Sequence, residues 1–133
     1  MITETDIQQL MKQAIAVSNN AYIPYSQYPV GAALRATDGS VYTGCNVENA
    51  AYPATICAER TALVKAVSEG RQNFDTLVVV TRNGGSPCGL CRQMLYEFAP
   101  KLRVIIGDLD GKISLDCRLS DLLPHGFGPQ SLE

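Results

Sequence analysis

The spacing of apolar residues along the chain predicts helices and strands in alternation. A first helix is expected from Thr5 to Asn20, because apolar residues recur every three or four positions there. Its stripe consists of Ile7, Leu10, Met11, Ala14 and Val17. Thr3 and Asp6 have the spacing of a capping box, with Asp in place of the more usual Glu. This stretch therefore predicts an amphipathic helix with a defined start.

Shorter apolar runs predict strands. Asp38-Gly39 separates the runs 30–36 and 41–45, which is a strong indication of a hairpin. Further strands are expected at 77–80, 104–106 and 113–115. The runs 77–80 and 104–106 are continuous and mostly β-branched, which is typical of strands buried on both faces.

Two more helices are expected between these strands. One runs from Cys57 to Gly70, and its apolar positions are Ala58, Ala62, Leu63, Ala66 and Val67. The other reaches Phe98, with Ser86 as the expected N-cap and Pro87 as the first helical residue. A last helical turn is expected at 119–123. Both crossovers from strand through helix to strand imply parallel pairing, and both helices should begin at the carboxyl edge of the sheet.

This order of elements predicts the α/β class, with one mixed sheet covered by helices. The 133 residues are expected to form a single domain, 1–133. Lysine and arginine total 11 against 13 acidic residues, a net charge of −2, so no cationic surface for nucleic acid is indicated. With no signal-peptide pattern and no apolar run of membrane-spanning length, we expect a cytoplasmic protein that contacts no membrane.

The candidate chemistry lies in two segments that contain Cys57, Glu59, Cys88 and Cys91. Together they match the Cys-x-Glu and Pro-Cys-x-x-Cys signature of zinc nucleobase deaminases. Three thiolates leave the fourth tetrahedral position of zinc open, as catalytic sites require. A Cys-x-x-Cys pair also occurs in redox sites and structural zinc knuckles, but a structural site needs a fourth ligand. The only histidine is His125, far away in a tail rich in Gly and Pro.

Over nearly its whole length the chain resembles the small, homotetrameric cytidine deaminases with three cysteine ligands to zinc. The segments that carry the resemblance are 25–34, 44–52, 57–62, 87–93 and 121–124. The most specific of them contains Asn46-Val47-Glu48-Asn49. The resemblance implies a three-layer α/β/α fold with a mixed five-stranded sheet and one Zn²⁺ per subunit. It also implies hydrolytic deamination of cytidine and deoxycytidine to uridine and deoxyuridine, in pyrimidine salvage.

The resemblance also assigns roles to individual residues. Cys57, Cys88 and Cys91 correspond to the zinc ligands and Glu59 to the catalytic acid and base. Substrate contacts are implied for Tyr28, Asn46, Glu48, Ala50, Tyr52, Ala58, Ser86 and Phe127. Asn46 and Glu48 correspond to the pair that binds the ribose. The Ala58 N–H would meet the pyrimidine carbonyl, and the Ser86 backbone carbonyl would meet the exocyclic amine.

Other implied roles extend beyond one subunit or beyond the substrate. Ala50, Tyr52 and Phe127 correspond to positions that reach the substrate of a neighbouring subunit. Arg60 corresponds to an arginine that hydrogen-bonds a zinc-bound sulfur. Tyr28 departs from the family, which often has phenylalanine there, and its added hydroxyl needs a partner.

From the residues alone, a polar turn is the favoured interpretation of Asn46 and Glu48. Several rival functions share parts of the same pattern. A blasticidin-type deaminase shares the zinc core. A polynucleotide-editing deaminase is disfavoured by the excess of acidic over basic residues. In a zinc-stabilised module without activity, Glu59 would have no function.

Overall fold

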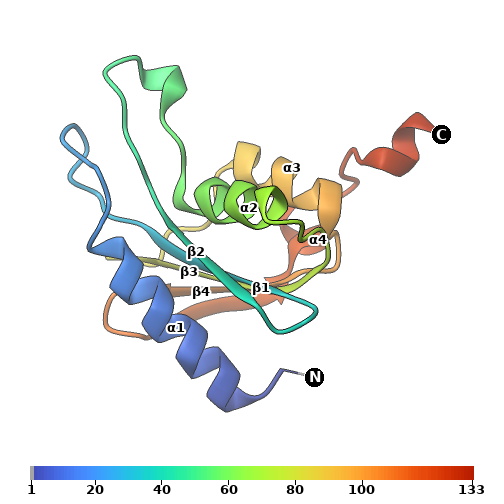
Figure 1. The fold of residues 1–133 in the computed structure, drawn as a ribbon, viewed down its shortest axis with the longest axis horizontal. Helices are drawn as coiled ribbons and strands as arrows, with labels where there is room; N and C mark the ends of the chain where they lie inside the picture. The colour runs from blue at the N-terminus through green and yellow to red at the C-terminus, as the bar shows by residue number, and fades with distance from the viewer. Residues whose placement is uncertain (1) are drawn as a thin grey trace.

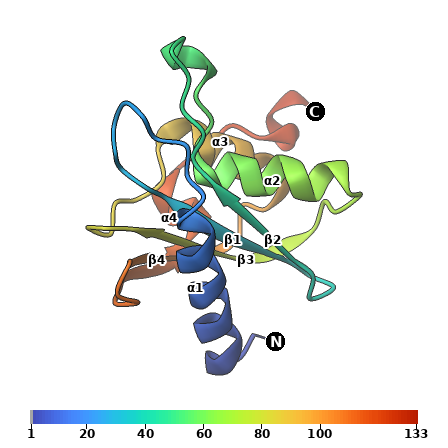
Figure 2. The same ribbon diagram turned by 60° about the vertical axis from the view of Figure 1, so that its left-hand side comes forward.

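A computed structural model describes residues 2–133 as a mixed β-sheet between two layers of helices (Figures 1 and 2). The helices are α1 (Glu4–Ser18), α2 (Ala58–Ser68), α3 (Gly89–Phe98) and α4 (Leu119–Leu122). The strands are β1 (Gly31–Ala36), β2 (Val41–Cys45), β3 (Phe74–Thr81), β4 (Arg103–Asp108) and β5 (Ile113–Arg118). Short 3₁₀ turns form η1 (Tyr52–Ala54) and η2 (Pro129–Leu132). The predicted α/β class with a five-stranded mixed sheet is confirmed.

The strand order is β2-β1-β3-β4-β5. The predicted hairpin joins β1 and β2, and β3 pairs in parallel with β4 across α3, as expected. The parallel pairing expected across α2 is wrong, because β1 lies between β2 and β3 and pairs antiparallel with both. The burial of the two strands explains this arrangement. Nearly every residue of β1 is buried, whereas burial alternates along β2, as suits an edge strand.

α1 covers one face of the sheet. Its stripe packs against alternate residues of the central strands, namely Ala33, Val78, Val80 and Ile105. Gly31 allows this close packing, since a Cβ at that position would lie 1.9 Å from the Ala14 carbonyl oxygen. Of the predicted stripe, Val17 is only half-buried, and Ser18 is buried at the helix end. The capping box of Thr3 and Asp6 is present as predicted.

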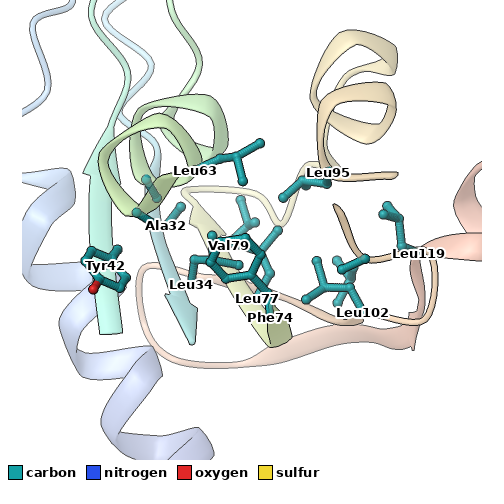
Figure 3. Close-up of a cluster of buried hydrophobic side chains, with 14 of the residues drawn as sticks. Ala32, Leu34, Tyr42, Leu63, Phe74, Leu77, Val79, Leu95, Leu102 and Leu119 are labelled. Carbon is teal, nitrogen blue, oxygen red and sulfur yellow. The ribbon is translucent and has the colours of Figure 1, made fainter. Parts of the chain in front are cut away.

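α2 and α3 cover the opposite face and enclose the larger core (Figure 3). Leu63 of α2 and Leu95 of α3 pack there over Leu77 and Val79 of β3, and all four are almost completely buried. Gly44 of β2 lets the start of α2 approach the sheet, because an added Cβ would lie 2.6 Å from the Ala58 carbonyl oxygen. The core therefore fixes where both helices begin.

Both helices of this layer start slightly later than the sequence indicated. Cys57 is the N-cap of α2 and is not its first helical residue. Ser86 was predicted as the N-cap of α3, which is wrong: Cys88 is the N-cap, in an extended conformation, and the helix begins at Gly89. The Ser86 hydroxyl accepts a hydrogen bond from Arg92 Nη2 instead (2.9 Å). No helix within residues 2–133 is long and apolar enough to cross a membrane.

A candidate zinc site and its pocket

Three cysteines gather where the N-termini of α2 and α3 meet. The Cys57 and Cys88 sulfurs are 3.8 Å apart, and those of Cys88 and Cys91 are 3.4 Å apart. All three sulfurs lie within 4.8 Å of one another, and all three cysteines are free. Thiolates about 2.3 Å from a tetrahedral zinc lie about 3.8 Å from one another. The cluster is therefore too wide for disulfides and fits a bound zinc ion.

The local backbone favours negative charge on these sulfurs. Cys57 and Cys88 are N-caps, and Cys91 lies in the first turn of α3, so the unpaired N–H groups of two helices surround the cluster. A hydrogen bond from Cys91, followed by those from Arg60 and Cys88, holds the pKa of the Cys57 thiol well below its ordinary value, against the effect of burial. The Cys57 sulfur is thus prepared to bind a cation as a thiolate, whereas the hydrogen bond with Cys57 and burial raise the pKa of the Cys91 thiol.

Arg60 lies beside the cluster on the first turn of α2. Its Nη2 is 3.1 Å from the Thr55 carbonyl oxygen and 3.7 Å from the Cys57 sulfur. The Arg60 Nε is buried and has no hydrogen-bond partner among residues 2–133. A permanent positive charge is therefore held next to the Cys57 sulfur.

Glu59 is a buried carboxyl group between these elements. It is 4% exposed and lines the same cavity as Cys57 and Cys88. Burial, with a smaller contribution from the negative charge on Cys57, raises the pKa of Glu59 to about 7. A carboxyl group with such a pKa can both accept and donate a proton near neutral pH.

A cavity of about 380 Å³ opens over the cluster. The positions predicted to contact substrate that line it are Tyr28, Asn46, Glu48, Ala58 and Ser86. The sequence reasoning did not identify the other lining residues, which are Ser26, Val30, Thr55, Val79, Thr81 and Gly85. Thr81 and Gly85 follow directly on the predicted strand 77–80, at the carboxyl edge where such sites occur. This position after a predicted strand was the feature of the sequence that could have identified them as site residues.

The polar wall of the cavity is a hydrogen-bonded loop held by Asn46 and Glu48. Asn46 Nδ2 donates to the Tyr28 carbonyl oxygen (2.8 Å), and Asn46 Oδ1 accepts from the Val30 N–H (3.0 Å). Glu48 accepts from the N–H groups of Tyr25 and Ser26 and from the Ser26 hydroxyl. Each side chain retains hydrogen-bonding capacity beyond these contacts.

Three predicted contacts lie outside this cavity. Ala50 and Tyr52 belong to the loop that ends in η1, which projects from the body of the molecule (Figure 1). Phe127 lies between α4 and η2 in the sequence, and this C-terminal segment lies apart from the loop of η1 in both views (Figures 1 and 2). The Tyr52 and Phe127 side chains are 71% and 56% exposed. The structure of one chain therefore does not bring these residues to the metal cluster.

A larger cavity, of about 720 Å³, lies between the end of α3 and the C-terminal segment. Its walls include Glu97, Lys101 and Arg118 but none of the clustered cysteines. Size alone does not identify the site. The chemistry is at the smaller cavity, where the three thiols and the buried carboxyl group meet.

A sheet between helices, with three cysteines and a buried glutamate at two helix N-termini, defines a zinc protein of the nucleobase-deaminase class. The model of the family described as "Cytidine and deoxycytidylate deaminase zinc-binding region" matches residues 4–107. The chain belongs to this family, and its cofactor is zinc.

Individual relatives agree with this assignment. A cytidine deaminase of Halalkalibacterium halodurans is 47% identical over 130 residues, which is 96% of this chain and 98% of the relative. The crystal structure of a cytidine deaminase from Burkholderia pseudomallei is 41% identical, with a TM-score of 0.86 over 95% of this chain and all of that one. A blasticidin-S deaminase of Bacillus cereus is 32% identical over 74% of this chain and 76% of its own length.

Proposed function

We propose that this protein hydrolyses the exocyclic amine of cytidine and deoxycytidine, giving uridine or deoxyuridine and ammonia. The observation that carries the proposal is the meeting of the thiol cluster and the buried Glu59 in one cavity with a polar wall. Relatives that match almost the whole chain at 45–47% identity are cytidine deaminases, which favours cytidine over blasticidin S. This activity fits a role in pyrimidine salvage in the cytoplasm. A single domain, residues 1–133, would carry it out.

Cys57, Cys88 and Cys91 would hold one Zn²⁺ per subunit. Bound zinc supplies a hydrolytic nucleophile near neutral pH by lowering the pKa of water to about 7. Glu59 would take the proton that the water loses and deliver it first to N3 of the pyrimidine and then to the departing amine. Its burial and its raised pKa suit a group that both accepts and releases a proton in one turnover.

Substrate binding would use the groups that line the cavity. Ala58 is the first helical residue of α2, so its N–H has no partner within the helix and could meet the pyrimidine carbonyl. The Ser86 carbonyl would accept the exocyclic amine. Asn46 and Glu48 would use their remaining hydrogen-bonding capacity on the ribose, beside the Tyr28 ring.

The proposed assembly is a homotetramer in which Ala50, Tyr52 and Phe127 complete the cavity of a neighbouring subunit. In one chain these residues are exposed and lie outside the cavity. Three further apolar residues of the surrounding loops are 40% or more exposed, namely Tyr25, Val47 and Ile56. Exposed apolar groups gathered on neighbouring loops are typical of a surface that binds a partner.

The test is an assay of the purified protein for zinc content and for ultraviolet-monitored conversion of three substrates. We expect conversion of cytidine, and little or none of blasticidin S or a short oligonucleotide. Glu59→Gln should retain zinc and the fold while turnover falls by about 10²- to 10⁴-fold. Loss of zinc in this variant would show that Glu59 is structural, and a faster reaction with blasticidin S would overturn the substrate.

A further inference from the structure

Tyr28 forms a contact that a phenylalanine at this position could not form, because phenylalanine has no hydroxyl group. Its ring is half-buried and lines the cavity, and its hydroxyl donates a hydrogen bond to Asn83 Oδ1 (2.5 Å). Asn83 belongs to the loop that joins β3 to α3, and Tyr28 to the loop that precedes β1. The hydroxyl thus joins two loops that are 55 residues apart in the sequence.

The two loops are held together by several further contacts. The Arg82 guanidinium lies 5.0 Å from the centre of the Tyr28 ring, within cation–π range, and its Nη1 donates to the Gln27 carbonyl oxygen (3.3 Å). Thr81 Oγ1 accepts from the Gly85 N–H (2.7 Å) and donates to Asn83 Oδ1 (3.3 Å). A Cβ added to Gly85 would lie 2.8 Å from the Tyr28 hydroxyl. These contacts fix the first half of the β3–α3 loop.

The second half of the same loop leads to the reacting end of the cavity. Arg92 Nε donates to the Pro87 carbonyl oxygen (2.8 Å), and Arg92 Nη2 donates to the Ser86 hydroxyl (2.9 Å). Between the two held ends are Gly84, whose φ is +71°, and Gly85. Two consecutive glycines have the greatest conformational freedom of any pair of residues. The position of Ser86 therefore depends on both anchors.

We propose that Tyr28 is a positioning residue: its hydroxyl, through Asn83, holds the β3–α3 loop so that the Ser86 carbonyl faces the amine of the substrate. The inference rests on the proposed function, because it requires a substrate with an exocyclic amine. A carbonyl fixed there accepts a hydrogen bond from the amine of cytidine, whereas it opposes the O4 acceptor of uridine. The Tyr28–Asn83 contact thereby sets the preference for the substrate over the product.

The experiment measures the affinity of cytidine and of uridine separately. In a Glu59→Gln background, which prevents turnover, Tyr28→Phe should weaken cytidine binding by about 3- to 10-fold, the usual effect of one lost hydrogen bond. Uridine binding should be unchanged or tighter. Asn83→Ala should act in the same way, and the double variant should be no worse than the stronger single variant. Asn83→Asp keeps an acceptor and should preserve the preference.

Tyr42→Phe is the matched control. The Tyr42 ring packs in the core, away from the cavity (Figure 3). We expect all variants to retain zinc and their melting temperature. Equal weakening of both ligands by Tyr28→Phe would mean that the hydroxyl supports the cavity as a whole and does not distinguish the amine, and no change would mean that the contact positions nothing. Either result overturns the inference while the deamination of cytidine by the unmodified protein still supports the proposed function.

Discussion

The floor and the rim of the candidate site are built in different ways. The floor consists of Cys57, Glu59, Cys88 and Cys91, all at the N-termini of two helices that pack on the sheet. The proposed rim consists of Ala50, Tyr52 and Phe127 of a neighbouring subunit, which are all exposed and lie outside the cavity of their own chain. Core packing fixes the floor within one chain, whereas nothing within residues 2–133 covers the rim. In the proposed assembly, one chain would therefore supply the chemistry and a second copy would complete substrate recognition.

The largest effect should come from breaking the floor. Cys88→Ala should release zinc, abolish measurable turnover and lower the melting temperature by on the order of 10 °C, because bound metal contributes folding free energy. Metal analysis and calorimetry on the purified variant measure both effects. Cys45→Ala and Cys117→Ala remove free cysteines outside the cluster and serve as controls. Stoichiometric zinc in Cys88→Ala would exclude Cys88 as a ligand.

The next effect tests whether the rim belongs to another subunit. Phe127→Ala should lower kcat/KM by about 5- to 150-fold if the ring stacks on the base. When Glu59→Gln and Phe127→Ala chains are co-expressed, hybrid tetramers contain sites with an intact Glu59 from one subunit and an intact Phe127 from another. Activity should then exceed the weighted sum of the two parents.

The matched control for this mixing experiment co-expresses Glu59→Gln with Glu59→Ala. Both changes lie on the floor, so no combination of subunits restores a complete site. Activity in the first mixture that equals the weighted sum would place the whole site within one chain, whereas recovery in the control would mean that mixing raises activity without any intact Glu59. An active monomer in light scattering would also place the whole site within one chain.

The floor could be predicted from the sequence because its determinants are local. Spacing alone places Cys88 and Cys91 on one face of a helix, and the continuous apolar runs at 77–80 and 104–106 indicate buried central strands. The hairpin at Asp38-Gly39 was equally local. The strand order could not be predicted from local sequence. The antiparallel pairing of β3 with β1 depends on which edge of the hairpin is covered. The mostly apolar run of β1, in which Arg35 is the only charged residue, was the indication that it is internal.

The N-cap of α3 and the pocket wall show where local rules fail. Ser86 is a good capping residue by type, but Arg92, six positions later, engages its hydroxyl. Asn46 and Glu48 were interpreted either as ligand contacts or as a polar turn, and the structure gives both side chains hydrogen bonds within the wall. Sequence spacing does not show how a side chain divides its hydrogen bonds between the protein and a ligand.

A smaller effect on the floor concerns its charge. Three thiolates and Zn²⁺ sum to −3 + 2 = −1, and the Arg60 guanidinium beside Cys57 offsets this excess. Arg60→Gln should lower kcat by about 10- to 100-fold, more than it raises KM. Adding Cys57→His, which supplies a neutral ligand, should recover part of the loss. Steady-state kinetics that show two simply multiplied losses would mean that Arg60 does not compensate charge.

The smallest effect concerns the wall between floor and rim, and it depends on pH. The Ser26 hydroxyl, followed by the backbone N–H groups of Ser26 and Tyr25, holds the pKa of Glu48 below its ordinary value. At pH values above that pKa, the ionised carboxylate therefore holds the wall together. This support is lost as the pH falls through the pKa of Glu48. Removing the hydroxyl in Ser26→Ala should raise the pKa of Glu48 toward its ordinary value.

We therefore expect the KM for cytidine to begin rising at a higher pH in Ser26→Ala than in the unmodified protein, by about 2- to 3-fold at the acid end, with little change in kcat. The measurement is KM across the acid range. Ser40→Ala is the matched control, because the Ser40 hydroxyl lowers the pKa of Asp38 in the same way but at the β1–β2 turn, outside the cavity. If the two variants have the same profile, Glu48 does not support the wall as a carboxylate. Its part in binding would then be confined to the ligand itself.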